Sequence, residues 1–404
     1  MPKDHELPAV PRKLIETPQE LSEVCEHLRH AGHFAFDTEF IGENTYQPVL
    51  CLVQVATRQR VELIDPMTIG RGDMQPFWQL LADPAIEKYC HAGDQDIEIV
   101  WQHSGLITKN LFDTQIAAGM IGLAYPTALW RAVEHFCDVS LDKAHTFSAW
   151  DRRPLSKAQF EYAIDDVRYL PKIHALIRER IAELGHTDWM TEACDQLCIE
   201  ASQPAEPRKR FMKIKGAASL ESDQLSVLRE LTALREQLAY EHDVPPRSFL
   251  KDEALIDIAT RMPESAERLA NIRSIPRTEL TSYGDQFLDA VARGLAVPED
   301  QRPHLYAPAE DSADIKRLGE MMWVAAQAIC LGQCVTPALV TSQSEVMSLA
   351  RLLHKKRTLD KHPLLHGWQK KCLGDKLLAF VRGEIALDLS MQNHLMHAHF
   401  HDHH

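Results

Sequence analysis

The sequence contains no apolar run long enough to cross a membrane and no apolar stretch near its beginning. The longest apolar run, at residues 321–332, is well short of the ~20 residues that a membrane-spanning helix needs. Residues 1–13 lack the apolar segment of a signal peptide. We therefore expect a cytoplasmic protein without a membrane partner.

The number of cysteines is odd, and no two of them form a C-x-x-C motif. The chain has nine of them, and a long chain without a secretion signal is expected to keep its thiols reduced. Two pairs, Cys194/Cys198 and Cys330/Cys334, are spaced by four and so share a helix face. Metal binding is one interpretation of each pair, but we favour core packing because cysteine is among the most buried residue types.

The chain has fewer basic than acidic residues, and it lacks the motif of a phosphate-binding loop. The chain has 44 Lys and Arg against 58 Asp and Glu, which gives a net charge of −14. Proteins that coat nucleic acid by charge alone need Lys and Arg to displace counterions, so the net charge argues against this class. The charge is compatible with an enzyme that acts on nucleic acid through metal ions held by carboxylates. No G-x-x-x-x-G-K-[ST] loop occurs, so we expect no nucleotide cofactor.

The first half of the chain alternates strand and helix patterns. With 404 residues, the chain is long enough for two or three domains. Short apolar runs predict strands at 33–40, 50–57, 61–65 and 88–93, and the run at 50–57 is rich in β-branched residues. Helical spacing follows at 94–105, 111–122 and 128–137. This order predicts an α/β or α+β domain in which helices flank a sheet.

A further helix is expected to begin at a capping box formed by Ser156 and Gln159. Pro171 must kink or end this helix, because proline lacks the backbone N–H and clashes with the preceding turn.

The second half shows helical patterns and no strand signals. They cover 222–294, with breaks at Pro245-Pro246, Pro263 and Gly284, and then 312–388. The similar lengths suggest a duplicated module. Basic residues that could contact phosphates, with solvated helix faces as the alternative, are Arg208, Lys209, Arg210, Lys213, Lys215, Lys355, Lys356, Arg357, Lys370 and Lys371.

The chain ends in a tail with six histidines. The tail could chelate transition metals, but we favour a disordered terminus. The predicted organisation is a sheet-containing domain at 1–205, a basic linker at 206–218, a helical domain at 219–296, a linker at 297–310, a second helical domain at 311–388 and the tail at 389–404.

Two carboxylates, Asp37 and Glu39, lie two residues apart in a predicted strand and so project from the same face. Such a pair on a buried strand is unfavourable unless cations neutralise it, and hard divalent cations prefer oxygen ligands of this kind. Asp96, in the first turn of a predicted helix, is the next candidate ligand. Its neighbour Asp94 is a rival candidate, or the helix N-cap.

Tyr162 and Asp166 are four residues apart on one predicted helix, so phenol and carboxylate point in the same direction. Asp165 points elsewhere and is interpreted as a solvated neighbour.

The ordered set D-T-E-F (37–40), H-A-G-x-x-D (91–96) and Y-x-x-x-D (162–166) resembles the DEDD exonucleases of the tyrosine subgroup, and more closely the ribonuclease D family. Residues 228–265 resemble an HRDC domain, and 364–384 resemble the end of a second HRDC-like unit. The resemblance implies a ribonuclease H-like 3′-5′ exonuclease fold, α/β with a mixed sheet, followed by two all-α HRDC-type domains.

The resemblance also implies the chemistry. Two divalent ions, Mg²⁺ or Mn²⁺, would be held by Asp37, Glu39, Asp96 and Asp166, and Tyr162 would orient the attacking water. Two metals ~3.5–4 Å apart can stabilise both the attacking and the leaving oxygen of an in-line displacement. The implied activity is 3′-to-5′ hydrolysis that releases nucleoside 5′-monophosphates. The implied partner is RNA with a free 3′ end, tRNA precursors above all, and the implied state is a monomer.

Additional candidates for substrate contact are Thr38, Phe40, His91, Lys143 and Arg153. Phe40 is a candidate for stacking on the terminal base, although a core position is at least as consistent with its context. A satisfied strand-end histidine is the alternative for His91, and solvated charge is the alternative for Lys143 and Arg153. Asp113 is interpreted as a helix cap rather than a metal ligand.

Two rival functions stay open at this point. A DNA exonuclease would use the same chemistry, because only the 2′-hydroxyl distinguishes the substrates. A catalytically silent RNA-binding scaffold is the other rival, but the intact set of four carboxylates and a tyrosine argues against it.

Overall fold

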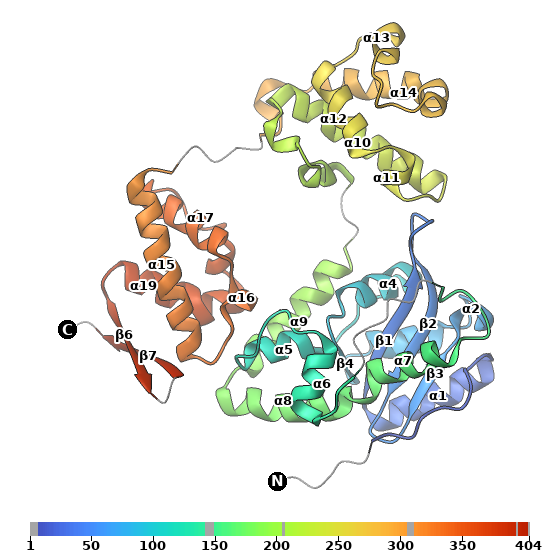
Figure 1. Ribbon diagram of the computed structural model, residues 1–404, viewed down its shortest axis with the longest axis vertical. Helices are drawn as coiled ribbons and strands as arrows, with labels where there is room; N and C mark the ends of the chain where they lie inside the picture. The colour runs from blue at the N-terminus through green and yellow to red at the C-terminus, as the bar shows by residue number, and fades with distance from the viewer. Residues whose placement is uncertain (1–6, 142–148, 204–206, 305–310, 393–394, 403–404) are drawn as a thin grey trace. The chain divides into compact units, whose positions relative to one another are not determined.

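The computed structural model describes residues 7–141, 149–203, 207–304, 311–392 and 395–402. Compact packing divides the chain into two units (Figure 1). Unit 1 comprises Met1–Glu39, Leu50–Gln203 and Asp311–His404, and unit 2 comprises Phe40–Val49 and Pro204–Glu310. None of the described helices combines the length and the apolar character that a membrane span requires.

A mixed five-stranded sheet, of order β3-β2-β1-β4-β5, forms the centre of the exonuclease-like half. β1 pairs in parallel with β4, with Phe34 opposite Lys88, and β4 pairs in parallel with β5. β2 and β3 are antiparallel. The strands are β1 (His33–Ile41), β2 (Val49–Ala56), β3 (Val61–Ile64), β4 (Glu87–Cys90) and β5 (Leu111–Asp113). The predicted α/β domain with a mixed sheet is confirmed.

Helices flank this sheet. They are α1 (Pro18–Ala31), α2 (Pro66–Ile69), α3 (Gln75–Ala82), α4 (Asp94–Ser104), α5 (Thr114–Met120), α6 (Leu129–Cys137), α7 (Lys157–Arg168), α8 (Leu170–Leu184) and α9 (Thr187–Ala201). The α7 helix begins at the predicted capping box, in which Ser156 and Gln159 bond reciprocally. α7 ends at Arg168 and α8 begins two residues later with Pro171 in its first turn, so the proline ends the helix as predicted.

One predicted helix is partly a strand. Residues 111–113 pair with β4 as the edge strand β5, and only then does α5 begin. Asp113 caps α5, because its carboxylate accepts hydrogen bonds from the backbone N–H groups of Gln115 and Ile116. The cap interpretation of Asp113 is confirmed. Three residues are too few to show a strand period, which explains why the sequence pattern missed this strand.

The C-terminal helical region packs against the exonuclease-like helices within unit 1. The N–H of Thr336 donates to the carbonyl of Gly119 at 2.9 Å, and Lys371 pairs with Glu192 at 3.3 Å. The elements of this region are α15 (Ala313–Gly332), α16 (Pro337–Val340), α17 (Gln343–His354), η4 (Pro363–Leu365), α18 (Gly367–Gln369), the π-helical η5 (Lys370–Gly374) and α19 (Asp375–Val381).

The described part of the tail is not disordered, contrary to the prediction. β6 (Ile385–Gln392) and β7 (Leu395–Asp402) form an antiparallel hairpin. Apolar and polar residues alternate along both segments, a period that favours strands. The density of histidines in this stretch concealed that pattern.

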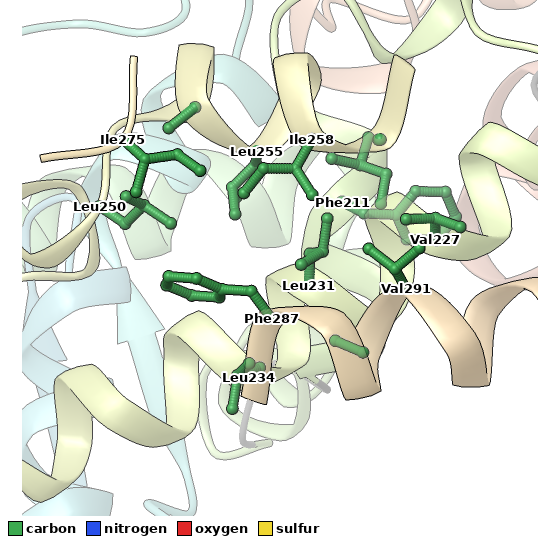
Figure 2. Packing of buried hydrophobic residues seen from close by; sticks show 14 of the residues in the cluster. Phe211, Val227, Leu231, Leu234, Leu250, Leu255, Ile258, Ile275, Phe287 and Val291 are labelled. Atoms are coloured by element: carbon green, nitrogen blue, oxygen red, sulfur yellow. The ribbon is translucent and has the colours of Figure 1, made fainter. Parts of the chain in front are cut away.

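Unit 2 is built around one long helix. α10 (Ser222–Glu241) packs against α14 (Arg277–Leu295) and α12 (Asp252–Arg261), with α11 (Pro246–Phe249), α13 (Ala266–Ala270), η1 (Pro207–Lys213), η2 (Ala217–Ser219) and η3 (Glu299–Gln301) completing the helical part. Figure 2 shows Leu231 of α10 among Leu255, Ile258 and Val291 in the core. Gly284 lies inside α14 and does not break it.

The predicted basic linker folds onto this core instead of connecting two domains freely. Phe211 is buried in the cluster that Figure 2 shows. Arg208 pairs with Glu230 at 3.0 Å, and Arg210 pairs with Glu236 at 2.5 Å. Both glutamates are almost fully buried. Each of these two arginines therefore neutralises a buried carboxylate.

Because α10 and α14 approach each other closely at Gly294, replacing this glycine is expected to destabilise the fold. A Cβ on Gly294 would lie 2.5 Å from the Cα of Val227, so Gly294→Ala would push the two helices apart. We expect a loss of about 1–3 kcal/mol in the free energy of unfolding, measured by chemical denaturation.

Gly284→Ala in the same helix is the matched control, because its nearest contact would be an ordinary 3.7 Å from Leu269. That variant should be neutral or more stable by up to about 1 kcal/mol, since alanine favours helix. Equal destabilisation by both variants would contradict the packing argument.

Candidate active site

Three carboxylates meet at the central strand of the sheet. Asp37 and Glu39 project from β1, and Asp166 comes from α7. Each offers an oxygen, and these oxygens all lie within 4.8 Å of one another. The predicted sharing of one strand face by Asp37 and Glu39 accounts for two of the three carboxylates, and α7 supplies the third.

α7 places two functional groups one turn apart, Tyr162 and Asp166. Both line a cleft of about 650 Å³, together with Trp130 and Leu141. The Oδ2 atom of Asp166 is buried and has no hydrogen-bond partner among the described residues. Asp165 instead pairs with Arg168 at 3.2 Å, outside the carboxylate cluster.

Asp96 approaches the same strand from the first turn of α4 and is only 6% exposed. The hydroxyl of Thr38 donates to Asp96 Oδ1 at 2.5 Å, and thereby connects Asp96 to the residue between the two β1 carboxylates. Asp94 is exposed, and the N-cap of α4 is Gly93. The structure thus favours Asp96 over its rival.

Asp113, the last residue of β5, stabilises the turn between β4 and α4. Its carboxylate accepts hydrogen bonds from the N–H groups of Ala92 and Gly93, at 3.2 and 2.9 Å. A side chain at position 93 would collide with the sulfur of Cys90 at 2.3 Å, so this position requires glycine. The sequence pattern identified Asp113 only as a cap and did not indicate this second role.

Burial and the charges of neighbouring groups disfavour the simultaneous ionisation of the four carboxyl groups. Burial first, and then the charges of Asp96, Asp166 and Glu39, raise the pKa of Asp37 well above its usual value. Burial is also the main cause that raises the pKa of Glu39 to about 9, of Asp166 to about 8 and of Asp96 to about 6. Four such groups close together need a compensating positive charge to be ionised near neutral pH.

Divalent cations fit this site on the evidence of its own atoms. All the converging groups are carboxylates, the ligands that hard cations prefer, and one buried oxygen of Asp166 lacks a partner. Tyr162 suits a role beside such ions, because burial and the charges of Asp166 and Glu39 raise the pKa of its phenol above the usual value. The phenol therefore stays neutral.

Several residues predicted to contact substrate have partners inside the protein. Both ring nitrogens of His91 are engaged, with Thr114 at 2.9 Å and the carbonyl of Thr127 at 2.8 Å. This supports the reading of His91 as a satisfied histidine. Thr38 is buried against Asp96, which gives it a positioning role.

The remaining three candidates for substrate contact differ in their placement. Arg153 donates to Asp65 at 2.6 Å and to the carbonyl of Cys51 at 2.7 Å, so its guanidinium is engaged in contacts within the protein. Phe40 is half-buried near the end of β1. Lys143 lies outside the described residues.

Known proteins match this chain along most of its length. A family described as 3′-5′ exonuclease matches residues 13–182, and the HRDC domain family matches residues 224–291. The ribonuclease D of Gluconacetobacter diazotrophicus is 36% identical, over 93% of this chain and 94% of its own. The ribonuclease D of Nitrobacter hamburgensis is 32% identical, over 93% and 96% respectively. The chain belongs to the ribonuclease D family.

Solved structures agree with this membership of the ribonuclease D family. The crystal structure of Escherichia coli RNase D, described as an exoribonuclease involved in structured RNA processing, superposes with a TM-score of 0.80. It is 27% identical and covers 92% of this chain and 99% of its own. The resemblance inferred from the three ordered motifs is thereby confirmed.

The raised pKa values of the carboxylates predict how metal and pH act together on stability. In the unfolded chain these groups have pKa values of about 4, so between about pH 4 and 9 the metal-free folded state binds more protons than the unfolded state. Its free energy of unfolding should therefore fall as pH rises through this window. Cations bind only the ionised set, so Mg²⁺ or Mn²⁺ should raise Tm more at pH 8 than at pH 5.5, measured against EDTA.

Asp166→Asn should largely remove this metal-dependent rise in Tm. Asp165→Asn is the matched control, because Asp165 belongs to an ion pair with Arg168 outside the cluster, and should retain the rise. A rise that is equal at both pH values would contradict the assignment of raised pKa values.

The hydrogen bond from Thr38 to Asp96 yields a second prediction for the site. Thr38→Val keeps the shape but removes the donor, so Asp96 loses its orientation. We expect a loss of about 10- to 100-fold in metal affinity or turnover, the usual effect of removing a group that orients a metal ligand. Thr38→Ser keeps the hydroxyl and should retain most activity. Full activity of the valine variant would show that this contact is unimportant.

Proposed function

We propose that this chain is a metal-dependent 3′-to-5′ exoribonuclease that releases nucleoside 5′-monophosphates from the 3′ end of RNA. The observation that carries the proposal is the convergence of Asp37, Glu39 and Asp166. Of these three, Asp166 lines a cleft together with the neutral phenol of Tyr162. Membership of the ribonuclease D family supports the same activity.

The proposed mechanism assigns a role to each of the chain's own groups. Asp37, Glu39, Asp96 and Asp166 would hold two divalent ions, which when bound lower the pKa of water and stabilise the departing 3′-oxygen. Tyr162 would hydrogen-bond the attacking water and orient it toward the phosphorus. Its phenol suits this role because its raised pKa keeps the proton in place.

The proposed substrates are structured RNAs with a free 3′ end, tRNA precursors among them. The Escherichia coli relative is an exoribonuclease involved in structured RNA processing, which is consistent with this choice. A monomer in the cytoplasm is the form that we propose for the enzyme. No described residue identifies how a 2′-hydroxyl would be read, so the comparison of RNA with DNA belongs in the first test.

That test is a digestion assay. A 5′-labelled tRNA precursor with a 3′ trailer, and a matched single-stranded DNA, are incubated with Mg²⁺, Mn²⁺ or EDTA. We expect stepwise shortening of the RNA from its 3′ end that depends on the metal. Equal or faster shortening of the DNA would replace the proposal by a DNA exonuclease. Binding of RNA without cleavage would replace it by a scaffold.

Substitutions in the cluster test the assigned roles. Asp37→Ala and Asp166→Ala should abolish turnover while circular dichroism shows an intact fold, because each removes a carboxylate of the metal-binding set. Tyr162→Phe should lower kcat by about 10²-fold, the scale of a positioned proton donor or acceptor, with metal affinity nearly unchanged. Normal activity of Asp37→Ala would show that the site is wrongly assigned.

A further inference from the structure

A small basic pocket lies where α7 ends and α8 begins. It has a volume of about 100 Å³ and is lined by Arg58, Arg168 and Lys172, with Pro8 and Pro171 among its apolar residues. No aspartate or glutamate lines it. In a chain with a net charge of −14, three cations around one cavity without an acid are unusual. We call this cavity the basic pocket.

The charges of the basic pocket are only partly compensated. Within the described parts of the chain, neither Arg58 nor Lys172 forms an ion pair. Arg168 bonds to Asp165 through one terminal nitrogen at 3.2 Å, while its Nε atom is buried without a hydrogen-bond partner. Its guanidinium lies 5.0 Å from the centre of the Tyr169 ring, which restrains it. The pocket therefore offers N–H donors and positive charge to an external anion.

The basic pocket adjoins the cleft that Tyr162 and Asp166 line. Arg168 lines both cavities, and in the cleft it accompanies Tyr162 and Asp166. The break between α7 and α8 brings this about, because Arg168 is the last residue of α7 and Lys172 belongs to the first turn of α8. An extended ligand could therefore continue from the carboxylates into the pocket.

The far side of the basic pocket, at Arg58, lies near the beginning of β1. Arg58 and His33, the first residue of β1, line one further cavity together. His33 precedes Asp37 by four residues of an extended strand, a span of ~13 Å. A ligand that reaches both places must be an oligomer or occupy two separate sites.

We propose that the basic pocket binds a backbone phosphate of the RNA, upstream of the nucleotide that is being removed. Arginine and lysine are the usual partners of phosphate oxygens, and contacts of this kind position a strand without reading its sequence. The proposal rests on the proposed function, since the strand that enters the pocket is the substrate of the neighbouring cleft. Its role is to hold the body of a long substrate while the 3′ end reacts.

The first experiment compares substrates of different length. We use the double variant Arg58→Ala/Lys172→Ala and measure kcat/KM for a trinucleotide and for a 20-nucleotide single-stranded RNA. Arg168 is left intact because it also bonds within the protein. We expect the preference for the long RNA over the trinucleotide to fall by about tenfold, since two phosphate-binding cations are lost.

The matched control is Arg29→Ala/Lys109→Ala, which removes the same charge from two exposed positions that line neither cavity. The control should keep the length preference of the unmodified chain. An equal fall in both double variants, or an unchanged preference in Arg58→Ala/Lys172→Ala, would overturn the proposal.

The second experiment measures RNA affinity in EDTA, so that its result does not depend on turnover. Each phosphate contact with a single strand contributes about 0.7 to the slope of log K against log salt. The slope should therefore become shallower by about 1.4 in Arg58→Ala/Lys172→Ala and stay unchanged in the control. An unchanged slope overturns the pocket assignment, whereas failure of the unmodified chain to hydrolyse any RNA overturns the proposed function instead.

Discussion

The mutual repulsion of carboxylates in a partly buried site is the constraint on which the rest of the exonuclease half depends. Asp37, Glu39 and Asp166 bring their oxygens within 4.8 Å of one another, and Asp96 adds to their field. Such a cluster would separate if its supports were flexible. The chain provides rigid ones, because the carboxylates are attached to the central strand of the sheet and to the two helices α4 and α7.

Local rules predicted the parts of the site that belong to one element. Asp37 and Glu39 share a strand face because side chains alternate, and Tyr162 and Asp166 share a helix face because a turn has 3.6 residues. Both relations follow from spacing alone. The sequence placed Asp96 near them only through the family resemblance, since spacing has no bearing on where a second segment lies.

Contacts between distant segments could not be predicted in this way. Thr38 and Asp96 are 58 residues apart, and Arg153 and Asp65 are 88 apart. Because the acidic partner of Arg153 is remote in sequence, the sequence offers phosphate contact and solvated charge as its two interpretations and does not indicate the ion pair. The acids that pair with Arg208 and Arg210 also lie at a distance in sequence, 22 and 26 residues further along the chain on α10. Short elements such as β5 were missed because three residues show no period.

The packing of the C-terminal region against α5 connects two parts of the chain that sequence comparison would treat as separate modules. Thr336 donates to Gly119 in α5, and the capping residue of α5 is Asp113, whose carboxylate also holds the turn that carries Asp96. A series of contacts thus connects the start of α16 to the turn that carries Asp96. Removal of the C-terminal region would therefore uncover one face of α5, the helix whose capping residue also holds the turn that carries Asp96.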